Sequence, residues 1–165
     1  MIIFGVDPGL NKTGIGVLEL SENNDFKFVD YRLIKNKSSF DVVEKIASLS
    51  KGVSEIIEKY NPSFAAIEES FYSVNVKTAI SLGLARGAIM SALLMQNVKV
   101  YQFTALQIKK SVVGYGKADK NQVRRMVEMQ LNISLKDVLN DISDALACAI
   151  CLAIFLKGNR YDKLY

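Results

Sequence analysis

Acidic residues stand at three places in this sequence where a strand ends or a helix begins. Asp7 follows the apolar run MIIFGV, and Glu68 and Glu69 end the segment FAAIEE. Asp141 and Asp144 are three residues apart at the start of an apolar helical stretch, so both project from one side of its first turn. Sheets that carry helices collect their chemistry at the carboxyl ends of strands. We therefore expect these acids to meet at one edge of a sheet.

Clustered carboxylates repel one another unless a cation neutralises them. Two divalent ions roughly 4 Å apart relieve that repulsion and can clamp a phosphodiester, one activating water and the other stabilising the leaving 3′ oxygen. The chain has no histidine, which excludes Ser-His-Asp and Cys-His mechanisms and the usual zinc ligand sets. Carboxylate sites of this kind favour Mg²⁺, with Mn²⁺ as the expected substitute.

Plainer interpretations exist for some of these acids. Asp-Pro-Gly at residues 7–9 is also good turn chemistry, and Asp141 in a first helical turn complements the helix dipole. Asp144 is harder to explain in this way, because it leads a stripe that continues through uncharged residues to Phe155. A carboxylate at the head of a core-facing stripe is costly unless it is paired or bound to a metal.

The two cysteines, Cys148 and Cys151, form a Cys-x-x-Cys pattern inside the same apolar stretch. A zinc site needs two more good ligands, and a redox pair stands at a helix N-terminus after a strand. We therefore expect both cysteines to pack in the core.

The elements that position these acids follow from hydrophobic periodicity. Residues 1–6, 13–20 and 26–34 read as three strands of an antiparallel meander. Residues 64–69 and 98–103 read as two further strands. Helices are expected from Ser38 or Ser39 to Tyr60, over 75–96, after Thr104, from Asp119 to Leu131, and from about 141 to 157. Small residues in 75–96 predict a helix packed on both sides, either within the chain or at a dimer face. The fold class is α/β with a mixed sheet.

The composition describes one globular domain over 1–165, with 21 basic and 17 acidic residues and a net charge of +4. A modest basic excess permits a polyanionic partner. The start shows no signal-peptide pattern, and no 18-residue uncharged apolar segment occurs, so we expect a cytoplasmic protein without a membrane span.

Candidate nucleic-acid contacts lie in two places. Residues 109–125 hold six basic residues and a glycine-flanked tyrosine against one acid, which suits phosphate contacts or simply a solvated face. They are Lys109, Lys110, Tyr115, Lys117, Lys120, Arg124 and Arg125. Phe71 and Tyr72 follow the acidic strand end and could stack on unpaired bases or fold onto the core.

Five segments together resemble the RuvC family of bacterial Holliday-junction resolvases, within the ribonuclease H-like nuclease superfamily. They are GVDPGLNKTGIGV, AAIEESF, ISLGLARGA, QIKKSVVGYGKADKNQV and DISDALACAI, and they span nearly the whole chain. The resemblance implies a ribonuclease H-like fold with a five-stranded mixed sheet flanked by helices. It also implies a structure-selective endonuclease that resolves four-way DNA junctions by paired symmetric nicks in recombination and repair.

The resemblance also implies roles for particular residues. Asp7, Glu68, Asp141 and Asp144 would carry two divalent ions, and Glu68 is selected over Glu69, which alternation alone left open. Lys109 and Lys120 resemble active-site basic residues, with Lys120 countering charge on the phosphate, and Phe71 resembles a junction-contacting aromatic. The family is homodimeric and works with the RuvA and RuvB branch-migration proteins.

Three other functions were weighed against this one. A YqgF-like nuclease acting on RNA would be shorter and lack the aromatic loop and the basic stretch. An ATP-binding domain of the actin and sugar-kinase type would need a second Asp-x-Gly motif. A catalytically silent junction-binding protein would keep carboxylates away from phosphates.

Overall fold

The computed structural model describes residues 1–21, 25–69 and 75–161. Five strands form one sheet in the order β3-β2-β1-β4-β5. β1 pairs antiparallel with β2 and β2 with β3, whereas β1–β4 and β4–β5 are parallel. The predicted five-stranded mixed sheet is therefore confirmed. The strands are β1 (Ile2–Asp7), β2 (Lys12–Leu20), β3 (Phe26–Lys35), β4 (Phe64–Glu69) and β5 (Lys99–Thr104).

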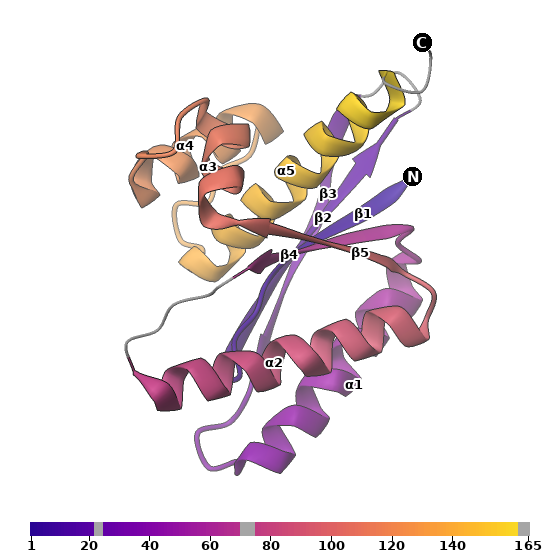
Figure 1. Ribbon diagram of the computed structural model, residues 1–165, viewed down its shortest axis with the longest axis vertical. Helices are drawn as coiled ribbons and strands as arrows, with labels where there is room; N and C mark the ends of the chain where they lie inside the picture. The colour runs from indigo at the N-terminus through magenta and orange to yellow at the C-terminus, as the bar shows by residue number, and fades with distance from the viewer. Residues whose placement is uncertain (22–24, 70–74, 162–165) are drawn as a thin grey trace.

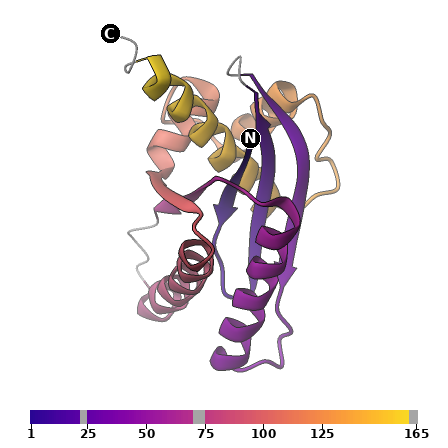
Figure 2. The same cartoon turned by 90° about the vertical axis from the view of Figure 1, so that its right-hand side faces the viewer.

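Helices cover both faces of the sheet (Figures 1 and 2). One face carries α1 (Val42–Tyr60) and α2 (Val76–Met95), and the other carries α3 (Ala105–Val113), α4 (Lys120–Leu131) and α5 (Asn140–Tyr161). Each face has its own apolar core: Phe4, Val6 and Ile67 point to the α1–α2 side, and Ile3 and Ala66 to the α5 side. The alternation of strand side chains thus decides which layer each residue meets.

Side-chain caps set most helix boundaries. Thr104 and Asp119 begin α3 and α4 as predicted, each in a capping box with the glutamine three residues later. Asn61 ends α1 in the left-handed conformation, with φ of 46°. The predicted start of α1 at Ser38 or Ser39 is wrong, because Asp41 accepts a hydrogen bond from the Glu44 amide and forms the capping box there.

Three glycines let α5 lie directly on β1 and β2. A Cβ at Gly5 would stand 2.2 Å from the Ala145 carbonyl oxygen and from the Ala149 nitrogen, and a Cβ at Gly14 would stand 2.1 Å from the Asp141 carbonyl oxygen. Gly16 meets the backbone of Leu146 in the same way. The predicted core packing of the two cysteines on α5 is confirmed, since both are buried.

Within the single chain, α2 packs on one side only. Its buried residues, Ala85, Ile89, Ala92 and Leu93, face α1 and the sheet, while most of the opposite face is exposed. By length and composition α2 is the one helix, among the described residues, that is apolar enough to cross a membrane, and only 22% of that window is buried. Most of the outward face of α2 is therefore uncovered within a single chain.

Candidate active site

Strand alternation brings Asp7 and Glu68 to the same side of the sheet. Gly5 pairs with Ala66 across the parallel β1–β4 ladder, and the next outward step on each strand is Asp7 and Glu68. Both carboxylates therefore project toward the α5 side of the sheet, at the carboxyl ends of neighbouring strands. Glu69 is one residue further on and points to the α1–α2 side.

The first turns of α5 bring the other two acids to this strand end. Gly14 pairs with Asp7 in the β1–β2 ladder, and the Asp141 backbone rests directly on Gly14. Asp144 follows one turn later and faces the hollow between α5, α3 and α4. The sheet edge and the start of α5 thus bring together four acids from three separate parts of the chain.

The electrostatics show that these carboxylates interact. Burial, and then the charges of Asp144, Glu68 and Asp141, raise the pKa of Asp7 to about 8. Burial and the Asp144 charge also raise the pKa of Glu68. A protonated acid at neutral pH is the expected response of a crowded carboxylate cluster that holds no cation.

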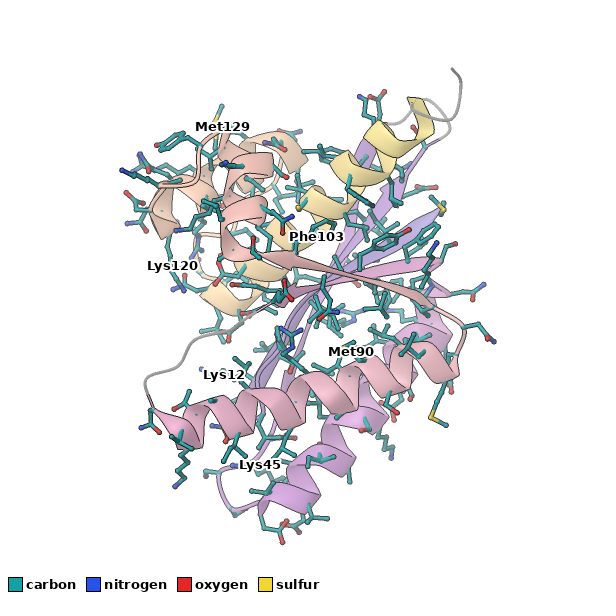
Figure 3. All side chains as sticks on the ribbon, viewed as in Figure 1. Lys12, Lys45, Met90, Phe103, Lys120 and Met129 are labelled. Atoms are coloured by element: carbon teal, nitrogen blue, oxygen red, sulfur yellow. The ribbon has the colours of Figure 1, made fainter. Side chains whose placement is uncertain are left out.

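Lys120 is the cation closest to this cluster. Its Nζ lies 3.4 Å from Asp144 Oδ2, and the Asp144 charge raises the pKa of the lysine. The lysine side chain is 74% exposed, so the pair contributes little to stability. Its position instead places an exposed positive charge in the same hollow as Glu68 and Asp144; Figure 3 shows Lys120 on the α3–α4 side of the molecule.

A hollow of about 200 Å³ opens beside the acids. We call it the α3–α4 hollow. Its lining combines apolar side chains with two carboxylates and two lysines, a set that suits a phosphodiester. Its lining residues are Glu68, Ala105, Ile108, Lys109, Lys120, Val123, Asp144 and Ala147.

The donor set fits hard divalent ions. The chain offers carboxylates without histidine, and its two cysteines are buried in the core. As the side chains are placed, no three acidic or cysteine groups within residues 1–21, 25–69 and 75–161 stand together closely enough to hold one metal ion. One of the four acids, Asp144, is instead paired with Lys120.

The predicted DNA contacts are distributed over several surfaces. Lys109 and Lys120 line the α3–α4 hollow, whereas Lys110 lies on the other side of α3, in a hollow with Cys151 and Phe155. Tyr115 and Lys117 are exposed in the α3–α4 connection. Phe71 and Tyr72 lie outside the described residues.

Arg124 and Arg125 line a separate cavity on the α4 surface with Glu128, Ser134 and Lys136. The two arginines are not equivalent. Arg124 Nη1 donates to Asn140 Oδ1 at 3.3 Å, which ties α4 to the first residue of α5, while Arg125 is exposed. Arg125 is therefore the better placed of the two to contact a phosphate.

Arg86 contributes to the site, although no motif in the sequence predicts this role. From α2 its Nη1 donates to the Glu68 carbonyl oxygen at 2.5 Å, and its Nη2 donates to Gln102 Oε1 at 2.6 Å. These bonds fix the end of β4, from which the Glu68 side chain extends. The available signal was its position as the lone charge in residues 78–95, an otherwise apolar helical stretch.

The raised pKa of Asp7 predicts a pH-dependent stability for the metal-free protein. Between about pH 4 and pH 8 the folded state keeps a proton that the unfolded chain, with a pKa of 3.8, releases. The contribution of this proton to the free energy of unfolding is complete below pH 3.8 and is lost as the pH rises to about 8. We expect the free energy of unfolding of Asp7→Asn to decrease less with rising pH than that of the wild type. Urea denaturation in EDTA across that pH range measures the difference. Equal slopes for the variant and the wild type would contradict the assignment.

Comparison with known proteins gives a single answer. The family model of crossover junction endodeoxyribonuclease RuvC matches residues 3–152. The RuvC of Caldicellulosiruptor saccharolyticus is 41% identical over 151 residues, covering 92% of this chain and 91% of its own. The RuvC of Alkaliphilus oremlandii is 42% identical over 153 residues, covering 93% of both chains.

Solved structures agree with the sequence comparisons. Thermus thermophilus RuvC, in complex with a Holliday junction substrate, superposes with a TM-score of 0.89 at 26% identity and covers 96% of both chains. Its match spans the sheet and the helices of both layers, which confirms the ribonuclease H-like fold. On the family model, these relatives and this shared architecture, the chain belongs to the RuvC family of crossover junction endodeoxyribonucleases.

Proposed function

We propose that this protein resolves four-way DNA junctions by paired symmetric nicks, one in each of two opposed strands. The observation that carries the proposal is the convergence of Asp7, Glu68, Asp141 and Asp144 beside a hollow that also presents Lys109 and Lys120. A surface meant only to bind phosphates would not place four carboxylates there. A phosphodiester entering the hollow meets acids on one side and lysines on the other.

Each side chain has a distinct task in this proposal. The four carboxylates would hold two Mg²⁺ ions, whose chemistry would be to activate a water molecule and to stabilise the leaving 3′ oxygen. Lys120 turns from Asp144 to the phosphate and neutralises charge there as the bond breaks. Lys109 holds a phosphate oxygen from the α3 side, and Arg86 keeps the Glu68 backbone in place.

The test of this function is cleavage of a strand-labelled synthetic four-way junction in Mg²⁺, beside a linear duplex of the same sequence. The proposal predicts nicks at symmetric positions in opposed strands of the junction and none in the duplex. Tight binding without nicks in Mg²⁺ or Mn²⁺ would contradict it and favour a silent junction binder. Cleavage of RNA alone would favour a YqgF-like activity.

The exposed cations of α4 and its flanking segment extend the DNA path beyond the hollow. We expect Arg125→Gln to make the plot of log affinity against log salt less steep by about 0.9, the loss of one phosphate contact. Fluorescence anisotropy with a labelled junction at several salt concentrations measures this. Lys51→Gln, which removes one exposed charge on α1, is the matched control. An unchanged slope for Arg125→Gln would leave this helix outside the footprint.

We further propose that the exposed face of α2 is the surface through which two copies form a dimer. Its apolar residues lie within about one third of the helix circumference, and Val76, Ile80 and Met95 are 72%, 58% and 81% exposed. Gly83 and Gly87 interrupt this face with no atom within 4 Å of an added Cβ, so two backbones can approach closely. A two-fold dimer presents two active sites to opposed strands of a four-way junction.

We expect Ile80→Asp to convert the dimer to a monomer at micromolar concentration, because a buried unpaired carboxylate disfavours association. Sedimentation velocity measures the change. Val43→Asp, at a residue that is 73% exposed on α1, is the control and should stay dimeric. A wild-type monomer, or an Ile80→Asp dimer of unchanged affinity, would exclude this interface.

The family resemblance extends the proposal to partners and place. We infer that the protein acts in the cytoplasm, where it meets junctions that RuvA and RuvB have moved. Co-sedimentation of the protein with a junction preloaded with RuvA tests the association.

A further inference from the structure

A second hollow meets the carboxylate cluster from the β1–β2 turn and α2, whereas the α3–α4 hollow meets it from the helices of the other layer. It has a volume of about 340 Å³ and runs between the β1–β2 turn and the first turns of α2. We call it the turn hollow. It reaches the cluster at Asp141, whereas the α3–α4 hollow reaches it at Glu68 and Asp144. Its lining residues are Gly9, Leu10, Asn11, Lys12, Thr78, Ser81, Leu82 and Asp141.

The chemistry of the turn hollow is that of a sugar-phosphate site. Leu10 and Leu82 contribute apolar side chains to its lining, and Lys12 contributes a positive charge. Thr78 and Ser81 are three residues apart on α2, so their hydroxyls belong to one face. The Asn75 side chain already accepts from the backbone amides of Lys77 and Thr78, which leaves the hydroxyls as the contacts that α2 offers.

The turn that forms one wall is held rigidly from behind. Buried Asn36 donates from Nδ2 to the Leu10 carbonyl at 2.8 Å and to the Lys45 carbonyl at 2.9 Å. The backbone N–H of Asn36 donates to the Asn11 carbonyl. Lys45 Nζ donates to Asn11 Oδ1 at 2.8 Å. A wall fixed by a buried amide and an α1 lysine is preorganised for a ligand and does not have to be ordered by one.

We propose that the turn hollow binds the nucleotide next to the scissile phosphate on the cleaved strand, with Lys12 contacting its phosphate. The proposal rests on the nuclease function proposed above. A strand whose scissile phosphate lies at the carboxylates has to leave the cluster on both sides. The α3–α4 hollow receives one side, and the turn hollow is the cavity with a cation and hydroxyls on the other. In Figure 3, Lys120 lies on the α3–α4 side and Lys12 beside α2.

The experiment combines one protein variant with single neutral linkages in the DNA. Junctions carry a methylphosphonate at one of the two phosphates that flank the scissile one. Wild type, Lys12→Gln and the control Lys51→Gln are compared by single-turnover cleavage in Mg²⁺ and by dissociation constant without metal. We expect Lys12→Gln to reduce the cleavage rate and the affinity for unmodified junctions about tenfold. At one flanking position, the neutral linkage should cause no further loss in this variant. Wild type and Lys51→Gln should lose about tenfold there.

The two readouts separate the two proposals. Equal sensitivity of Lys12→Gln and wild type at both flanking positions overturns the turn-hollow site, even if the junction is cleaved normally. Wild-type binding without cleavage overturns the nuclease function, and the dissociation constants still decide whether Lys12 contacts the flanking phosphate. Thermal melting of each variant checks that the half-buried Lys12 side chain can be replaced without loss of fold.

Discussion

Replacing Glu68 with glutamine is expected to reduce junction cleavage by about a thousand-fold or more, while junction affinity changes by no more than a few-fold. Glu68 leaves β4 on the same side as Asp7 and interacts electrostatically with Asp144. The amide keeps the shape of the side chain but removes a negative charge that divalent ions require. Single-turnover cleavage of a labelled junction in Mg²⁺, with affinity measured without metal, separates the two effects.

The neighbouring glutamate provides a matched control. Glu69 stands one residue later on the same strand and points to the other face of the sheet, so Glu69→Gln should cleave within about threefold of wild type, the size of ordinary surface effects. The two variants make the same chemical change on opposite faces of the sheet. A difference in cleavage between them therefore shows that the position of the carboxylate matters. Equal losses at Glu68 and Glu69, or a loss of binding at Glu68 as large as the loss of cleavage, would mean that these acids act through structure.

Replacing Gly5 with alanine is expected to lower the free energy of unfolding by about 3 kcal/mol or more. The added Cβ would stand 2.2 Å from the backbone of α5 at Ala145 and Ala149, and neither is the end of a flexible side chain. Relief requires α5 to lift from β1. Because Asp141 and Asp144 begin that helix, the four carboxylates would separate at the same time. Urea denaturation measures the loss.

Gly158→Ala is the control for the glycine substitution. It lies on α5, with no atom within 4 Å of an added Cβ, and alanine favours a helix by about 0.5–1 kcal/mol over glycine. We therefore expect neutral or slightly increased stability. If Gly5→Ala were as stable as wild type, α5 would not rest on the sheet as described, and the placement of the acids would need another explanation.

The fold was predictable from the sequence because its signals are local. Hydrophobic alternation, the Asn61-Pro62 stop and the caps at Thr104 and Asp119 each depend on residues close in sequence. Asp144 was identified because it leads an uncharged helical stripe. The start of α1 was misplaced because serines and an aspartate compete within four residues, and the Asp41–Glu44 pair makes two reciprocal bonds.

Other features depend on contacts that periodicity does not encode. FAAIEE is apolar on both faces because helices cover both sides of β4, so alternation left Glu68 and Glu69 equivalent until the neighbouring strands were in place. The small residues of α2 predicted close packing, but they do not distinguish packing within the chain from packing against a second copy. Arg86 and Asn36 donate hydrogen bonds to carbonyl oxygens of residues that are distant in the sequence. No spacing rule predicts such partners.

The measurement that most directly tests the proposed site is the number of Mn²⁺ ions that the protein binds, determined by electron paramagnetic resonance of free Mn²⁺ during titration. The carboxylate cluster predicts two sites per chain in wild type, with Glu69→Gln unchanged. Glu68→Gln and Asp7→Asn should lose at least one site. If both variants bound Mn²⁺ as wild type does, the four acids at the end of β1, β4 and α5 would not be the metal site.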